Sequence, residues 1–190
     1  AFATACSGDV EQGGVNIPAE RGIVLNLSGG ALGVATRAED MADNEREYAI
    51  QHLDVMIFND AEDKADMSLF YHERVTAAGP SGEVRLGVDI DSIVVGAKYW
   101  VYVVAHFTAD ASTFSAIGNV ENLVGLTQSN YSLHLTGTGL ANTPSRFLMD
   151  GVAYMGAAEP ATPAAITITE GQIDDVVTLK VTMRRAAAKV

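Results

Sequence analysis

The one cysteine of this sequence, Cys6, has the surroundings with the most distinctive chemistry. It lies in Ala3-Thr4-Ala5-Cys6-Ser7, with small residues before it and a polar stretch after it. A lone cysteine is often a small buried hydrophobe, but burial is not expected in so polar and flexible a segment. An exposed thiol on an exported protein would be reactive, whereas acylation removes the thiol and supplies a membrane anchor. The pattern therefore favours lipid attachment at Cys6.

A second candidate for covalent chemistry is the peptide bond between Arg37 and Ala38. Small residues surround it within a loop-like stretch over 29–44, and proteases cut exposed loops of this kind. Most loop arginines are ordinary solvated residues, so the hypothesis depends on position. Just before the loop lies a strand-prone segment, Ile23-Val24-Leu25-Asn26-Leu27. A cut after Arg37 would release this segment together with Cys6, whereas a cut after Arg21 would leave it attached.

No arrangement typical of an enzyme or a metal site accompanies these residues. The four histidines lie in strand-like runs without a partner at ligand spacing, namely His52, His72, His106 and His134. Asp89-Ile90-Asp91 lacks the glycine and the closing glutamate of a calcium loop. Ser81 does not lie in a nucleophile elbow. We therefore expect neither an enzyme nor a cofactor, since function must be argued from a site.

Composition narrows the classes of partner. The net charge of −12 argues against binding to nucleic acid, and against attraction to anionic lipid by charge. Hydrophobic residues make up 48% of the 190 residues and charged residues 19%, which is typical of a folding chain with a real core. One cysteine excludes an internal disulfide. No apolar run reaches the roughly 18 residues of a membrane-spanning helix.

The pattern of the remaining chain predicts an all-β fold. One short helix is expected over 119–126. The segment 98–107 is expected in a central position because of its β-branched and aromatic residues, and Leu69, Tyr71 and Glu73 are expected on one face of their strand. Strand-like runs cover 22–28, 52–58, 67–76, 83–90, 98–107, 146–150, 165–169 and 176–185. Seven or eight short strands indicate a two-sheet sandwich.

In these residues the sequence resembles the N-terminal domain of a fimbrillin, a subunit of type V pili. The resemblance runs over nearly the whole chain, and the order and spacing of its pieces carry it. The pieces are Ala3-Thr4-Ala5-Cys6, Ile23–Leu27, Thr36-Arg37-Ala38, Ile50–Asn59, Tyr99–His106, Val120–Leu123, Phe147–Gly151 and Arg185–Val190.

The resemblance implies a fold and a mechanism. The fold would be a Greek-key, transthyretin-like β-sandwich of about seven strands with one short helix. The precursor would be a lipoprotein anchored to the outer membrane through Cys6. An Arg-specific protease would cut between Arg37 and Ala38, and the strand Ile23–Leu27 would leave. Another pilin subunit would then insert a donor strand, and a cell-surface fimbrium would grow.

The expected organisation has three parts. Residues 1–20 would be a lipobox remnant with a flexible tether, 21–37 the N-terminal strand and cleavage loop, and 38–190 the β-sandwich domain. Fimbrillins usually have a second β-domain with a C-terminal donor strand, which we expect to be absent from this sequence.

Two alternatives remain open at this stage. A fimbrial anchor or tip adhesin would keep its lipid and need no cleavage after Arg37. A lipid-anchored module that binds surface glycans would need an exposed aromatic platform. The one tryptophan, Trp100, lies in the strand expected to be most buried. Exposure of Trp100 beside Tyr99 or Tyr102 would favour the glycan-binding module.

Overall fold

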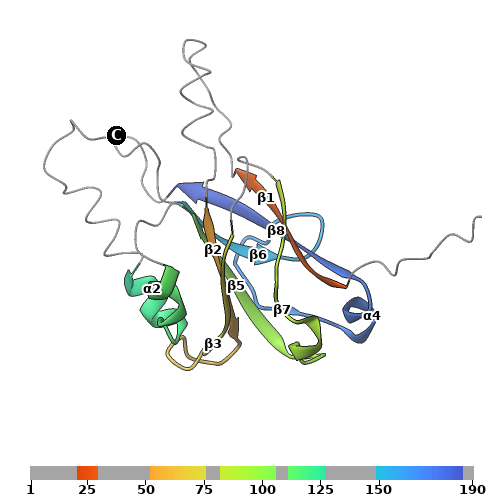
Figure 1. Ribbon diagram of the computed structural model, residues 1–190, viewed down its shortest axis with the longest axis horizontal. Helices are drawn as coiled ribbons and strands as arrows, with labels where there is room; N and C mark the ends of the chain where they lie inside the picture. Colours follow the sequence, from red (N-terminus) through yellow and green to blue (C-terminus); the bar gives the residue numbers. More distant parts are fainter. Residues whose placement is uncertain (1–20, 30–51, 76–81, 106–110, 127–148, 186–190) are drawn as a thin grey trace, which may run out of the picture.

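The computed structural model describes residues 21–29, 52–75, 82–105, 111–126 and 149–185. These residues form a mostly β structure, which confirms the all-β prediction. A mixed sheet curls around the larger of two hydrophobic cores, called the main core (Figure 1). Its strands are β1 (Gly22–Gly29), β2 (Leu53–Asn59), β3 (Leu69–Val75), β4 (Gly82–Arg85), β5 (Lys98–Ala105), β6 (Met149–Tyr154), β7 (Ile166–Thr167) and β8 (Val176–Arg185).

The strand order within the sheet is β3-β2-β5-β6-β8-β1-β4, and the short β7 pairs with β5. All the pairs of described strands are antiparallel except β1 with β8, which run parallel. The central position predicted for 98–107 is confirmed, since β5 lies between β2 and β6. β1 and β8 are the first and last strands along the chain, yet they are neighbours in the sheet.

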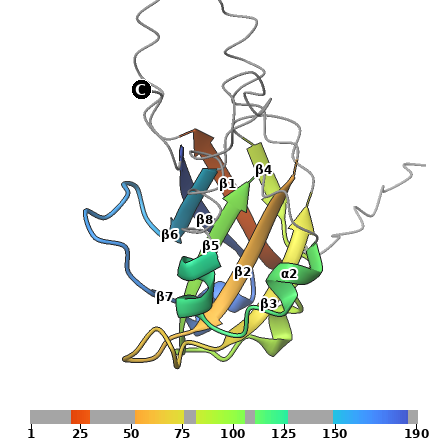
Figure 2. The same cartoon turned by 90° about the vertical axis from the view of Figure 1, so that its left-hand side faces the viewer.

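The strand β2 is buried on both faces, which explains its nearly continuous apolar sequence. Leu53, Val55 and Ile57, which alternate along the strand, point into the main core. Met56 and Phe58 point the other way, into a second core. That second core is covered by α2 (Ala111–Ser115) and the helical segment 120–126, which lie over β2, β3 and β5 (Figure 2).

Local details differ from the sequence predictions. The strand-like run over 83–90 leaves the sheet after Arg85 and turns into the short helix η1 (Ile90–Ser92). The single helix expected over 119–126 is present as 120–126, but α2, η1 and α4 (Glu170–Ile173) accompany it. The strand expected over 146–150 is β6, and residues 146–148 lie outside the described ranges.

A β-bulge separates residues that were expected on one face of β3. The register against β2 shifts between Ile57 and Phe58, whose partners are Tyr71 and Leu69. An extra residue in one strand reverses the alternation, so positions two apart across it point to opposite faces of the sheet. Tyr71 packs against the main core, whereas Leu69 packs against the second core. The prediction that Leu69 shares a face with Tyr71 is therefore wrong.

Close packing between β6 and β8 leads to a first prediction. A Cβ atom added at Gly151 would lie 2.7 Å from the carbonyl oxygen of Thr182 and 2.8 Å from a methyl group of Val181. We expect Gly151→Ala to lower the free energy of unfolding by about 1–3 kcal/mol, because backbone must shift to admit the methyl group. Urea unfolding followed by circular dichroism measures this change.

The matched control is Gly171→Ala in α4, where an added Cβ meets no atom within 4 Å. This variant is expected to be neutral or more stable by up to about 1 kcal/mol, because alanine restricts the unfolded chain. Equal losses at Gly151 and Gly171 would contradict the close approach of β6 and β8.

Candidate functional site

The strand β1 is an interior strand of the sheet, with β8 on one side and the edge strand β4 on the other. All eight of its residues are in parallel register with β8, from Gly22 opposite Val176 to Gly29 opposite Met183. Its other edge pairs antiparallel with β4, from Val24 opposite Arg85 to Leu27 opposite Gly82. If β1 left, both neighbours would expose unpaired backbone groups, which is the condition under which another strand can add.

The side chains of β1 make it part of the main core. Ile23, Leu25 and Leu27 are 0–3% exposed and point into that core, while Val24, on the opposite face, is 3% exposed. Burial of a large aliphatic side chain contributes about 1.5–3 kcal/mol. Four such side chains therefore hold β1 by roughly 6–12 kcal/mol, without any covalent bond to the neighbouring strands.

The N-terminal end of β1 is fixed by charged groups. The Arg21 guanidinium makes two contacts with the Asp91 carboxylate, at 3.1 and 3.3 Å. The Arg85 guanidinium donates to the backbone carbonyl of Arg21 at 3.1 Å, and Gly22 already belongs to the sheet. A protease needs extended and accessible backbone, so this environment disfavours a cut after Arg21.

The predicted site residues divide into two groups. The five residues proposed as a detachable strand lie together in β1: Ile23, Val24, Leu25, Asn26 and Leu27. The lipidation candidate Cys6 and the cleavage candidates Arg37 and Ala38 lie outside the described residues. The structure therefore provides the geometry of the strand, while lipid attachment and cleavage stay predictions.

A buried ionic cluster lies on the other side of the sheet, and sequence reasoning missed it. Asp54 of β2 is fully buried. Its carboxylate accepts two hydrogen bonds from Arg74 Nε, at 2.9 and 3.1 Å, and one from Arg74 Nη2, at 2.8 Å. It also lies 3.0 Å from His72 Nε2. The sequence pattern of β3 gives no signal for this cluster, because only the pairing of β3 with β2 brings Arg74 and His72 to Asp54.

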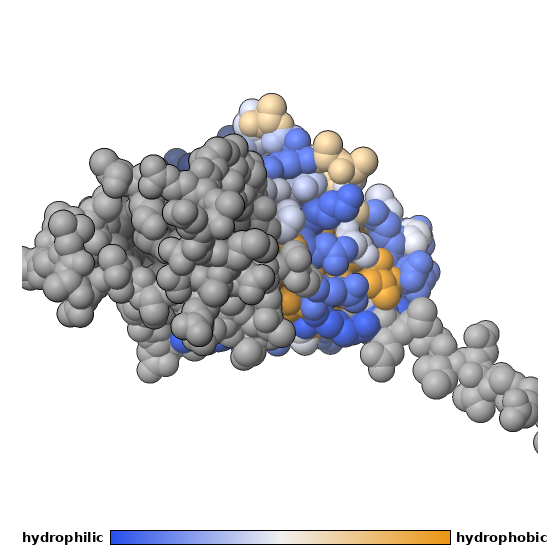
Figure 3. Space-filling model, turned by 90° about the horizontal axis from the view of Figure 1, so that it is seen from above, coloured by the Kyte–Doolittle hydropathy of each residue, from blue (hydrophilic) through white to orange (hydrophobic). Residues whose placement is uncertain are grey.

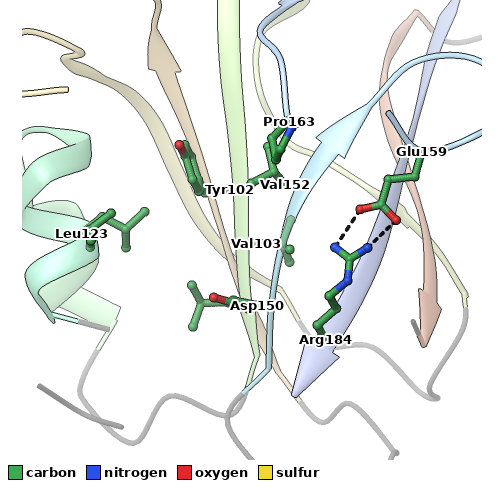
Figure 4. A pocket seen from close by; sticks show the side chains of 11 residues that line it. Tyr102, Val103, Leu123, Asp150, Val152, Glu159, Pro163 and Arg184 are labelled. Atoms are coloured by element: carbon green, nitrogen blue, oxygen red, sulfur yellow. Dashed lines mark hydrogen bonds and ion pairs between the residues drawn. The ribbon is translucent and has the colours of Figure 1, made fainter. Parts of the chain in front are cut away.

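A shallow pocket of about 180 Å³ lies beside β5, β6 and the helical segment 120–126 (Figure 4). Tyr102 and Leu123 form part of its apolar wall, and an ion pair between Glu159 and Arg184 at 2.7–2.8 Å lies at its rim. Hydrogen bonding to Arg184 lowers the pKa of Glu159, and the same bond raises the pKa of Arg184. Glu159 and Arg184 bind each other, so neither offers an unpaired charge to a ligand in the pocket.

Of the three aromatic residues of β5, Trp100 and Tyr102 are partly exposed and lie side by side, whereas Tyr99 is buried. Tyr99 is buried in the main core. Trp100 is half-buried, stacks against Tyr102 with a ring-centre distance of 6.2 Å, and donates its indole N–H to Asp60 at 2.6 Å. Burial raises the pKa of Tyr102. Both rings pack against the second core.

Surface features point to no other chemistry in the described part of the chain. Within those residues, no three His, Cys, Asp or Glu side chains gather as metal ligands. None of the helices described there is long and apolar enough to cross a membrane. The described surface seen in Figure 3 is mostly hydrophilic with small apolar patches. The strand β1 is therefore the strongest candidate for a functional site.

Comparison with known protein families identifies the family of this chain. Residues 23–184 match the family described as Major fimbrial subunit protein (FimA). The chain belongs to the FimA family. The match begins within β1 and ends within β8, so it includes both strands of the parallel pair.

The other comparisons add no closer relative. No curated protein matches the sequence. Among solved structures, the chain is similar to a candidate cell adhesion protein from Parabacteroides distasonis, with 14% sequence identity and a TM-score of 0.42. That alignment covers 84% of this chain and 45% of the other, so the chain spans less than half of that protein's length.

The burial of β1 leads to a second prediction. Leu25 is completely buried at the middle of the strand. We expect Leu25→Ala to lower the free energy of unfolding by about 2–5 kcal/mol, because the truncation leaves a cavity in the main core. The urea midpoint measures the loss.

Val94→Ala is the control, since Val94 is 64% exposed. Its effect is expected within about 0.5 kcal/mol of zero. A Leu25 variant as stable as the Val94 variant would contradict the packing of β1 into the core.

Proposed function

We propose that this FimA-family protein is a structural subunit of a cell-surface fimbria, which polymerises when a strand of a neighbouring subunit replaces β1. The observation that carries the proposal is the position of β1. It is an interior strand of the sheet, buried on its core face, and bound to its neighbours β8 and β4 by non-covalent contacts. A strand held in this way can be exchanged for another of similar pattern.

Cleavage after Arg37 is proposed as the step that makes exchange possible. While the chain is intact, β1 is tethered to its groove and rebinds faster than any competing strand. A single cut removes this advantage and leaves β1 as a separate segment. The segment would carry Cys6 with it, so the lipid anchor at the outer membrane would be lost in the same step.

The proposed partner is another pilin subunit that offers an extended strand. The groove left by β1 would accept apolar side chains at alternate positions, where Ile23, Leu25 and Leu27 now lie. Backbone hydrogen bonds to β8 and β4 would supply affinity, and the core-facing side chains would supply specificity. Such a joint needs no catalytic residue and no cofactor.

We also propose that the curled sheet corresponds to a Greek-key, transthyretin-like sandwich. Two observations support this assignment. β1 and β4 share the main core with β2 and β5, as the two layers of a sandwich would. Strands that follow each other along the chain, such as β1 and β2, are separated in the sheet, as crossover connections require.

The alternatives have different requirements. An anchor or tip adhesin of the fimbria would retain β1 and the segment before it. A lipid-anchored glycan-binding module would use Trp100 and Tyr102, but these rings are packed against the second core and Trp100 already donates to Asp60. The position of β1 fits a polymerising subunit, and cleavage after Arg37 is the property that separates this proposal from an anchor.

Limited digestion of the folded protein with an Arg-specific protease tests the proposal. We expect a cut after Arg37, seen by intact mass, and gradual release of residues 1–37 on size-exclusion chromatography. The nicked protein is expected to capture a donor-strand peptide that the intact protein does not bind. Arg37→Ala should abolish both release and capture.

The matched control is Arg46→Ala, which removes the next arginine along the chain. This variant is expected to be cut and to capture peptide like the wild type. A fold that resists cutting after Arg37, or that is cut there without gaining the ability to capture a strand, would favour the anchor or the glycan-binding module.

A further inference from the structure

The groove that holds β1 has two walls, β8 and β4, and β8 has more contacts with the rest of the sheet than β4 has. β8 has ten residues and pairs with β6 as well as with β1. β4 has four residues, and its only ladder among the described strands is with β1. The next amide, that of Leu86, also donates to β1, at the carbonyl of Ile23. When β1 leaves, β4 therefore loses its ladder, and another contact must keep it in place.

The contact that could do this comes from the opposite edge of the sheet. β3 and β4 are the two ends of the strand order, and the curl of the sheet brings them together. The backbone N–H of Gly87, just beyond β4, donates to Glu73 Oε2 of β3 at 2.8 Å. The hydroxyl of Tyr71 donates to the same oxygen at 2.5 Å.

The Glu73 carboxylate makes this a charge-assisted contact. Gly87 is exposed, Glu73 and Tyr71 are half-buried, and hydrogen bonds to a charged oxygen are stronger than neutral ones. Burial and the hydrogen bond to Glu73 raise the pKa of Tyr71, whose hydroxyl donates to the carboxylate. A Cβ added at Gly87 would lie 3.5 Å from both Glu73 Oε1 and the Tyr71 hydroxyl, which shows how closely the backbone approaches them.

Apolar packing alone would not orient β4. Val84, Leu86 and Val88 point into the main core and resist its departure. However, packing is not directional, whereas pairing with an incoming strand requires the N–H and C=O groups of β4 to lie in the plane of the sheet. The Glu73–Gly87 hydrogen bond is directional and fixes the backbone one residue beyond Leu86.

We propose that Glu73 is a positioning residue that holds β4 as the second wall of the groove while β1 is absent. This inference rests on the proposed strand exchange. In the intact protein β1 keeps β4 in place, so loss of Glu73 has little effect on β4 there. Once β1 has left, the Glu73–Gly87 contact keeps β4 in place, so that an incoming strand can pair with both β8 and β4. Without this contact it would pair with β8 alone.

The test uses the full-length protein, nicked after Arg37, and a labelled synthetic peptide with the sequence of residues 22–29. Glu73→Ala is expected to weaken peptide capture about tenfold or more, the effect of losing a hydrogen bond to a charged group. Glu73→Gln should capture peptide better than Glu73→Ala and less well than the wild type, because its neutral amide oxygen can accept from Gly87 but more weakly than a carboxylate. Glu73→Asp keeps the charge but shortens the side chain, so it should resemble Glu73→Ala and serves if the alanine variant does not fold.

Glu83→Ala is the matched control, since it removes the same charge from an exposed position on β4 itself. It is expected to capture peptide like the wild type. Hydrogen exchange gives a second readout. The amides of Val84 and Leu86 should exchange faster in nicked Glu73→Ala than in nicked wild type, with no such difference between the intact proteins.

The outcomes separate the two proposals. Equal capture by wild type and Glu73→Ala, or an equal loss of β4 protection in the intact and nicked variants, would overturn the role of Glu73 alone. Failure of the nicked wild type to capture the peptide would overturn strand exchange at β1, and the role of Glu73 with it.

Discussion

The structure depends on the double pairing of β1, which joins β8 to β4 and contributes three side chains to the main core. No disulfide can reinforce this position, because the chain has a single cysteine. The stability of the curled sheet therefore rests on a strand held by hydrogen bonds and apolar packing. β1 also precedes every other described strand in the chain. The proposed cut after Arg37 would separate β1 from all the other described strands, whereas release of an internal strand would need two cuts.

The two cores would be affected differently by the exchange of β1. The main core contains the side chains of β1, so exchange of β1 must rebuild part of it. The second core, formed by Met56, Phe58 and residues of the covering helices, contains none of them. It lies on the other face of β2 and β5 and would keep these strands together while the groove is empty. A fold with a single core shared by all its strands would lose much more of its packing when one strand left.

The sequence predicted where the strands lie better than it predicted which strands pair with each other. Alternation and β-branched residues identified β1, β2, β5 and β8, because each strand buries apolar side chains along its whole length. The same reasoning extended β4 to residue 90, although the strand ends at Arg85, since Leu86 and Val88 continue to alternate into the main core beyond it. Pattern along one strand carries no information on the parallel pairing of β1 with β8. It also could not show that Asp54 is fully buried or that Glu73 meets Gly87, since both contacts join segments that only the folded sheet brings together.

The alternation of β3 connects these separate features. On one face of the strand, Arg74 and His72 bind the buried Asp54 carboxylate of β2, and breaking such a pair leaves an uncompensated buried charge. On the other face, Glu73 accepts the Gly87 amide next to β4. An edge strand has a neighbour on one side only, so its position would otherwise depend on a single ladder. The Asp54 cluster adds a second, directional attachment to β2, and this makes β3 a firm base from which Glu73 can hold β4. Weakening the cluster at Asp54 should therefore loosen the β4 wall of the groove as well, although Asp54 lies on the face of the sheet turned away from the main core.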